Sequence, residues 1–374
     1  MSCPIRKYPL SQPPNYKPAI PRLQLALGDE LASVQTAYVG IQRHSNGKQL
    51  YEAFQSLIIF IQNWLSDKEI SSPLAYEWTE LIDGSDISGA FIWICYWKDH
   101  SSLERSLQKL DIAGYWSSLD PLSRTSIGIW TEVFSTQRSR LETVYSKDDY
   151  LPGLASLPGA VVAQHNMTGY WGAARDRIPD ASIDLFPVDD DVSFGPLSTT
   201  PDSKGKHLTG SSHQNLAHIR SGQFWEWCDA EEREAYETKL EPALREGLSY
   251  LWNEPEKSHA MGLRFLRNRN TLISKADEII EDGDSVKRRE TSVAGFFTDL
   301  ASMEAWAQSH PSHDAIWQGA MNHNKNFPGE QKKFRTWHEV SVLKAGEARF
   351  EYVNCMPETG LIRFIQLEEK SLLC

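Results

Sequence analysis

The residue best placed to do chemistry near the C-terminal end of the chain is His313. Proline suits the first position of a helix and disfavours helical geometry in the residue before it, so we predict that one helix ends near Ser309 and another begins at Pro311. His313 then lies in the first turn, on the apolar side that carries Ile316, Trp317 and Ala320. An imidazole on such a side is either a packed core residue or a metal ligand, for example to the iron of a flat, apolar haem.

A second histidine, His338, belongs to a predicted strand over residues 337–342. Alternation along this strand places His338 on the same face as Val340. A histidine in a water-poor pocket can deliver a proton, because its unperturbed pKa is near neutrality, but taken alone it could equally be a packed histidine. His310, which we expect to cap the helix, is an alternative iron ligand, and we expect His323 to be exposed.

The elements that must position these histidines alternate between strands and helices. In the first part of the chain we predict strand 34–42, helix 47–65, strand 88–97 and helix 99–110. A second round contains strands 161–170 and 215–222, helix 229–252, strands 260–267 and 292–298, and helix 299–309. The two rounds echo each other, since residues 91–104 resemble residues 292–304, and an internal duplication is plausible.

This order favours an α+β fold of the duplicated ferredoxin-like, or dimeric α+β barrel, type, in which two sheets close around a shared interior. No G-x-G-x-x-G follows a predicted strand, which argues against a dinucleotide-binding fold. We expect an extended N-terminal arm over 1–33 and a single domain over 34–374, made of two halves at about 34–150 and 151–374. The segment 192–214, rich in Ser, Thr, Gly and Pro, is predicted to be a long loop.

Composition narrows the function classes. The formal net charge of −12 over 374 residues argues against a nucleic-acid ligand, because phosphate binding needs a concentrated basic surface. No apolar run approaches the ~20 residues of a membrane span. Five scattered cysteines form neither a disulfide framework nor a covalent haem motif, so we expect a reducing, cytoplasmic location and non-covalent binding of any haem. The 13 Trp, 13 Tyr and 14 Phe residues suit the walls of an apolar pocket.

Four separated segments resemble the haem-containing aldoxime dehydratases, including the phenylacetaldoxime dehydratases. They are GYWGAARDRIP at 169–179, IRSGQ at 219–223, SHPSH at 309–313 and WHEVSVL at 337–343. The similarity covers most of the chain from about residue 34, and four motifs in the family order are more specific than any single histidine. The resemblance implies a haem b lyase that converts an aldoxime, R-CH=N-OH, into a nitrile and water, with the oxime nitrogen bound to ferrous iron. It also suggests a homodimer.

The resemblance further implies roles for individual residues. His313 matches the axial ligand of the haem iron, and His338 matches the distal acid that protonates the departing hydroxyl. Arg175 matches the distal arginine, Ser221 a serine that bonds to the oxime hydroxyl, and Glu142 the carboxylate that works with the distal histidine. Hydroxide is a poor leaving group, so protonation by His338 while Ser221 and Arg175 hold the oxygen would ease its departure.

Several alternatives stay open. Arg177 could replace Arg175 as the functional arginine, and Arg175 could form an ordinary ion pair in a loop. Ser221 could satisfy a turn, and Glu142 could be a surface carboxylate on a helix. A haem peroxidase or chlorite-handling oxidoreductase, or a non-catalytic haem carrier or gas sensor, would also use an axial histidine. The side chain of the oxime substrate stays open as well, because a large apolar wall accepts several shapes.

Overall fold

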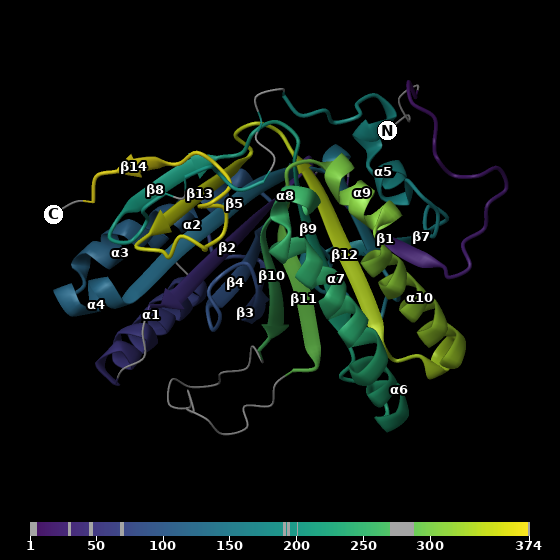
Figure 1. The fold of residues 1–374 in the computed structure, drawn as a ribbon, viewed down its shortest axis with the longest axis horizontal. Helices are drawn as coiled ribbons and strands as arrows, with labels where there is room; N and C mark the ends of the chain where they lie inside the picture. Colours follow the sequence, from purple (N-terminus) through teal and green to yellow (C-terminus); the bar gives the residue numbers. More distant parts are fainter. Residues whose placement is uncertain are drawn as a thin grey trace.

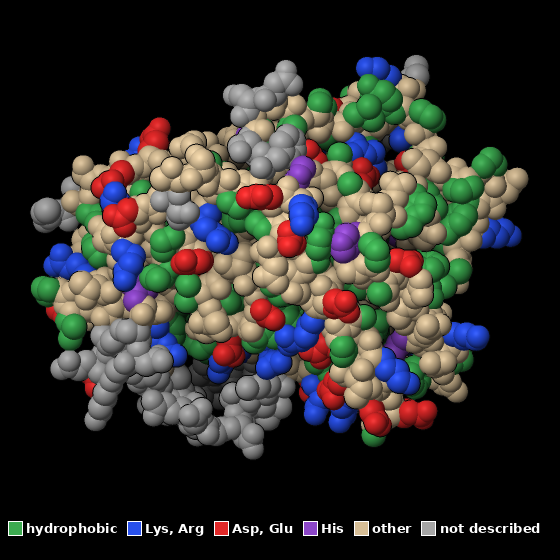
Figure 2. Space-filling model, viewed as in Figure 1, with side chains coloured by type: hydrophobic (Ala, Val, Ile, Leu, Met, Phe, Trp, Pro, Cys, Tyr) green, Lys and Arg blue, Asp and Glu red, His purple; other side chains and the backbone are tan. Residues whose placement is uncertain are grey.

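The computed structural model describes residues 6–28, 31–44, 48–67, 71–189, 192, 195–199, 201–269 and 288–372. No helix among them is long and apolar enough to cross a membrane. On the face shown in Figure 2, acidic and basic side chains are interspersed, so this face offers no continuous basic surface of the kind that nucleic acid requires. Cys95, Cys228 and Cys355 are buried and free.

The strands of the described residues form one sheet in which neighbouring strands are antiparallel (Figure 1). Their order across the sheet is β14-β8-β13-β5-β2-β4-β3-β10-β11-β9-β12-β6-β1-β7. The bounds are β1 Arg22–Ala26, β2 Ser33–Arg43, β3 Ala75–Gly84, β4 Phe91–Trp97, β5 Ile127–Gln137, β6 Leu141–Tyr145, β7 Val161–His165, β8 His207–Ser211, β9 Leu216–Phe224, β10 Ala260–Asn268, β11 Glu290–Phe297, β12 Arg335–Leu343, β13 Ala348–Val353 and β14 Glu368–Lys370.

The helices fall into two groups on the two sides of Figure 1. The first group is α1 Lys48–Ser66, α2 His100–Leu110, α3 Ile112–Ser118 and α4 Pro121–Ser126. The second is α6 Ala230–Ala235, α7 Glu241–Asn253, α8 Pro255–Ser258, α9 Leu300–Ser309 and α10 Pro311–Asn326, while the short α5 Ala173–Arg177 lies near β1 and β7. A π-helical turn at Tyr236–Leu240 joins α6 to α7.

Each group of helices packs against a run of four strands, and the two runs have the same topology. The run β2-α1-β3-β4-α2-β5 places its strands side by side in the order β5-β2-β4-β3, and the run β9-α7-β10-β11-α9-β12 gives the matching order β12-β9-β11-β10. The second strands of the two runs, β3 and β10, pair in the middle of the sheet. The sheet curves around a packed interior. A hydrogen bond from Thr136 on β5 to Ser341 on β12, which is distant in the strand order, shows this curvature; the two hydroxyl oxygens are 2.9 Å apart.

Helices cover the outer face of the sheet in both parts. One apolar cluster joins α1, α2 and α3 to β2, β4 and β5, and another joins α7 and α9 to β10, β11 and β12. Asp99 and Asp299 cap α2 and α9 in the same way, since each side chain accepts a hydrogen bond from the backbone amide three residues on, that of Ser102 or Ser302. Such caps contribute about 1 kcal/mol each.

Most predicted elements are confirmed within a few residues, but several strands were not predicted and two predicted segments differ. Within the arm predicted to be extended over 1–33, Arg22–Ala26 forms β1 between β6 and β7. The segment 192–214 is not one loop, since it contains β8, which pairs with β13. Strands β3, β5, β6, β13 and β14 were not predicted, and residues 166–170 lie outside β7. The pairing also mixes the two expected halves, because β6 joins β12 and β13 joins β5.

Candidate functional site

A cavity of about 260 Å³ lies between the outer face of the second part of the sheet and the helices α7, α9 and α10. Its wall is mainly apolar and consists of Leu244, Leu248, Leu251, Leu263, Val293, Phe297, Met303, Trp306 and Ile316, among others. The polar lining comes from Glu142, Arg177, Ser221, Glu304, His313 and His338. An apolar pocket with a few polar groups is typical of a site for a small molecule or cofactor.

His313 reaches this cavity from the first turn of α10, as predicted. Its ring lies edge-on against the ring of Trp306, with 4.8 Å between their centroids. Burial lowers the pKa of His313, although the backbone carbonyl of Ala307 partly favours the protonated ring. Nδ1 is buried without a well-formed hydrogen bond to any described residue, so this nitrogen is available as a ligand. The apolar side of α10 is narrower than predicted, because Trp317 is 50% exposed.

The other two histidines of this region have structural contacts. His310 caps α10 as expected, because its Nδ1 accepts a hydrogen bond from the backbone amide of Ser312 at 3.3 Å. Its ring also stacks on Tyr250, with the centroids 3.7 Å apart. The expectation that His323 is exposed was wrong, since it is buried and its Nε2 lies 3.1 Å from Oε1 of Glu232. Of the histidines singled out on α10 and at its cap, His313 is the one that lines the cavity.

The sheet side of the cavity presents a connected trio of ionisable residues. His338 on β12 and Glu142 on the neighbouring strand β6 are joined by a 2.9 Å contact between Nε2 and Oε1. Arg177, at the end of α5, approaches the same carboxylate with Nε at 3.1 Å and Nη2 at 3.2 Å. Its Nη2 also lies 3.3 Å from Nε2 of His338, and its Nη1 donates to the carbonyl of Met167.

The carboxylate at the centre of this trio is ionised. Burial acts to raise the pKa of Glu142, but the charges and hydrogen bonds of Arg177 and His338 outweigh it and lower the pKa to about 2. Glu142 is therefore neither on a helix nor on the surface, and its side chain is fully buried. The ionised carboxylate of Glu142 lies 2.9 Å from Nε2 of His338, and this contact fixes the orientation of the imidazole beside the cavity.

Ser221 lies next to His338 on the adjacent strand. The two residues face each other in the pairing of β9 with β12, and both line the cavity. The Ser221 hydroxyl donates to the carbonyl of Trp337 at 3.4 Å, which is long for such a bond. The hydroxyl can therefore turn toward a ligand at little cost. Ser221 belongs to a regular strand, so it does not satisfy a turn.

The structure places Arg175 apart from the other predicted site residues. Its Nε and Nη2 contact the carboxylate of Glu304 at 3.0 Å and 2.6 Å, and Nη1 donates to the carbonyl of Leu185 at 2.7 Å. Arg177 is the arginine that the structure brings to Glu142. Sequence reasoning did not single out Glu304, although a helix over 299–309 was predicted there.

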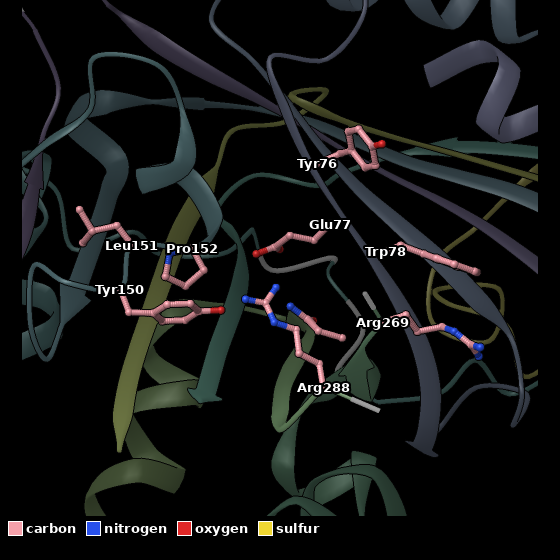
Figure 3. A pocket seen from close by; sticks show the side chains of 9 residues that line it. Tyr76, Glu77, Trp78, Tyr150, Leu151, Pro152, Arg269 and Arg288 are labelled. Atoms are coloured by element: carbon pink, nitrogen blue, oxygen red, sulfur yellow. The ribbon is translucent and has the colours of Figure 1, made fainter. Parts of the chain in front are cut away.

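A second cavity, of about 190 Å³, is lined by residues of β3, of the end of β10 and of the segment 150–152 (Figure 3). The side chains of Glu77, Tyr150 and Arg288 point toward one another in it. Glu77 contacts the buried Arg220, and Tyr150 donates to Glu290, whose pKa is raised to about 7 mainly by burial. These ionisable side chains lie on the inner face of the curved sheet, whereas His338 and Ser221 lie on its outer face. The second cavity is therefore separate from the first.

The residues around the first cavity fit a haem. His313 supplies an imidazole nitrogen that forms no good hydrogen bond with any described residue, and the apolar side chains suit a flat macrocycle. A directly bound metal ion has less support, since no group of three or more His, Cys, Asp or Glu residues among those described could hold one. The second histidine approaches the cavity from the sheet layer, while His313 comes from the helix layer.

Comparison with known proteins points to one family. The sequence profile of the haem-containing dehydratases matches residues 37–361. An aliphatic aldoxime dehydratase of Pseudomonas chlororaphis is 29% identical over 352 residues, which cover 94% of this chain and 93% of that protein. A phenylacetaldoxime dehydratase of Bacillus sp. strain OxB-1 is 26% identical over 361 residues, covering 96% and 95%.

A solved structure agrees with the sequence comparison. The crystal structure of an aldoxime dehydratase in complex with butyraldoxime superposes with a TM-score of 0.80 at 28% identity. The match covers 97% of this chain and 94% of the other. Its similarity therefore includes both groups of helices and the whole sheet, and is not confined to the cavity.

Proposed function

Because the chain belongs to the haem-containing dehydratase family, we propose that it converts aldoximes into nitriles and water with a haem b held by His313. One observation carries the proposal: His313 from the helix layer and the ion-paired His338 from the sheet layer line the same apolar cavity. The aldoxime dehydratases among its relatives, which match the chain almost end to end, support an aldoxime as the substrate.

The residues of the cavity divide the reaction between them. When bound, a ferrous haem would supply a coordination position and electron density for the oxime nitrogen. His338 would give a proton to the oxime oxygen as the N–O bond breaks, so that water leaves instead of hydroxide. The neutral ring could then accept the proton lost from the aldoxime carbon, which restores His338 and completes the nitrile. Glu142 would hold the ring of His338 in position throughout, through its contact with Nε2.

Two further side chains would hold the leaving oxygen. We assign to Arg177 the role that the sequence analysis gave to Arg175, because Arg177 contacts both Glu142 and His338 while Arg175 is engaged by Glu304. Ser221 can turn its hydroxyl toward the same oxygen from the neighbouring strand. Fixed donors aimed at a developing charge in a water-poor site stabilise the transition state without reorganisation.

We also infer that the fold is a duplicated ferredoxin-like unit. The two matching strand orders, β5-β2-β4-β3 and β12-β9-β11-β10, support this, as do the identical Asp caps of α2 and α9. The haem would then lie on the outer face of the second unit alone.

The proposal is tested with protein loaded with haem. His313→Ala should lose the Soret band while His310→Ala keeps it, because His310 is occupied as a cap and a stacked ring. Retention of the band in His313→Ala, or its loss in both variants, would contradict the assigned ligand. After reduction by dithionite, the wild type should turn over an aldoxime under nitrogen. Dye oxidation by peroxide that far exceeds this turnover would favour a peroxidase instead, and haem transfer without any turnover would favour a carrier.

A further inference from the structure

The N-terminal arm contacts the short helix that carries Arg177. The carboxylate of Asp176 accepts hydrogen bonds from the backbone amide of Ser11, at 3.1 Å and 2.9 Å to its two oxygens, and from that of Gln12 at 3.1 Å. The hydroxyl of Tyr170 donates to the same carboxylate at 3.0 Å. Asp176 is only 6% exposed, so these bonds replace its contacts with water. A buried carboxylate with this many donors forms a strong anchor.

The arm holds the other support of Arg177 as well. The side-chain amide of Gln12 donates to the carbonyl of Asn166 at 3.0 Å, and the next residue, Met167, provides the carbonyl that accepts from Nη1 of Arg177. The arm thus contacts a residue beside each of the two attachments of Arg177. Residue 176 precedes Arg177 in the chain, and residue 166 precedes Met167, whose carbonyl accepts from the Arg177 guanidinium.

Two glycines let the arm approach this segment. Gly172 has a φ of +86°, and a Cβ there would meet Oγ of Ser11 at 2.6 Å. Gly169 has a φ of +80°, and a Cβ there would meet the hydroxyl of Tyr16 at 2.7 Å. Both positions therefore combine a left-handed backbone with no room for a side chain. The segment is built to receive the arm closely.

Helix α5 needs such an anchor. It has five residues, and isolated helices shorter than about 12 residues are marginal in water, so contacts outside the helix must fix its orientation. We propose that Asp176 is a positioning residue, and that the N-terminal arm, bound to it, holds Arg177 against Glu142 and His338. This inference rests on the proposed function for its effect on activity, but the clasp itself can be measured without haem.

The first experiment is hydrogen exchange on full-length protein without haem. Asp176→Asn weakens the acceptor, and Gly172→Ala pushes the arm away while keeping the carboxylate. Both should speed amide exchange across residues 166–182, whereas Lys17→Ala, an exposed position on the same arm, should not. Unchanged exchange in both Asp176→Asn and Gly172→Ala would overturn the clasp, whether or not the protein turns over an aldoxime.

The second experiment is a double-mutant cycle on the haem-loaded protein. Asp176→Asn should lower kcat/KM by about tenfold to a hundredfold, since a misplacement of roughly 1 Å can cost this much. In an Arg177→Ala background the same substitution should have little effect, because its target is gone. An equal loss in both backgrounds would show a general effect on the fold and overturn the positioning role. If the wild type itself turns over no aldoxime, the proposed function fails, and hydrogen exchange alone decides the clasp.

Discussion

Trp130 on β5 and Trp337 on β12 occupy matching places in the two parts of the sheet. Trp130 faces Gly40 on β2, and Trp337 faces Gly222 on β9; in both cases a Cβ on the glycine would collide with the indole. An arginine lies over each ring, Arg264 at 4.3 Å and Arg220 at 4.8 Å from the centroid. The comparison gives a register in which residues of β5 and β2 have counterparts on β12 and β9.

The inner faces differ in how charge is balanced. Two residues after each tryptophan lies a buried glutamate, Glu132 or Glu339. Glu132 accepts two hydrogen bonds of 2.7 Å from Arg264. Among the described residues Glu339 accepts hydrogen bonds from the Tyr145 hydroxyl and the Leu154 amide instead, and burial raises its pKa to about 7 despite the opposing charge of Arg220. Glu132 thus forms a buried ion pair in which Arg264 bonds to both carboxylate oxygens. The charge of Arg220 does not outweigh the effect of burial on the pKa of Glu339.

The outer faces differ in chemistry. His338 and its neighbour Ser221 correspond to Thr131 and Val39. Glu142, which faces Val340, corresponds to Arg349, which faces Val133 and pairs with Glu104 on α2. One scaffold therefore carries a buried trio of ionisable residues in one part and a surface ion pair in the other. The strand order supplies matching positions, and the residues on the outer face differ in chemistry.

The largest expected effect comes from exchanging the counterparts on the outer face. His338→Thr places the residue of the silent part into the cavity, and nitrile formation should fall about 10²- to 10⁴-fold because the proton donor is lost. The reverse exchange, Thr131→His, should leave the rate unchanged, since Thr131 does not line the cavity that contains His313 and His338. Steady-state kinetics at equal haem content measures both, and a rate within a factor of about two for His338→Thr would refute the assigned donor.

The next largest effect is the difference in kcat between variants of the two arginines of α5. Arg177→Ala removes a donor beside the leaving oxygen and the counter-charge of Glu142, so kcat should fall about 100-fold. Arg175→Ala breaks a partly exposed pair with Glu304 and should cost about 1 kcal/mol of stability with a much smaller kinetic effect. If Arg175→Ala proved the more damaging in kinetics, the assignment of the distal arginine would have to be reversed.

Neutralising the two buried glutamates should change the free energy of unfolding in opposite directions. Glu132→Gln breaks a buried ion pair and should cost about 3 to 5 kcal/mol of unfolding free energy. Glu339 has a folded pKa above its unfolded value of 4.5, so the folded state binds its proton more tightly, and its effect on stability becomes less favourable as pH rises from 4.5 to about 7.

Urea unfolding at about pH 5 and about pH 8 checks this difference. Glu339→Gln should be stabilised relative to the wild type more at the higher pH, because the variant has no carboxyl to ionise. Equal behaviour of the variant and the wild type at both pH values would show that Glu339 does not titrate in this window.

The smallest effect concerns the matching helix caps. Asp99→Ala and Asp299→Ala each remove one cap and should destabilise the protein by about 1 kcal/mol. Only Asp299→Ala should also weaken haem binding, because α9 carries Met303 and Trp306 of the cavity wall. Titration of the unloaded protein with haem, followed at the Soret band, separates the two; equal haem affinity in both variants would argue against a role of α9 in the pocket.

Local rules predicted the elements that their own residues specify. Pro311 fixed the start of α10, and with it the place of His313, because proline limits the backbone on both sides of itself. Asp99 and Asp299 marked helix starts for a similar reason. Strand β3 was missed because its polar residues, such as Glu77, face a polar cluster inside the sheet and break the expected alternation.

The choice of arginine could not be made from spacing. Arg175 and Arg177 lie two positions apart on one helical turn, so their side chains point about 200° apart and only one can face the cavity. Which one does depends on the arm and on Glu142, both distant in sequence. The burial of Glu142 depended likewise on the pairing of β6 with β12 across nearly 200 residues, which no local pattern encodes.

The most direct test is the product formed by the reduced, haem-loaded wild type under nitrogen. Incubation with butyraldoxime or phenylacetaldoxime, followed by chromatographic analysis, should yield one nitrile for each aldoxime consumed, with no added oxidant. A protein that binds haem through His313 yet leaves both aldoximes unchanged would contradict the account.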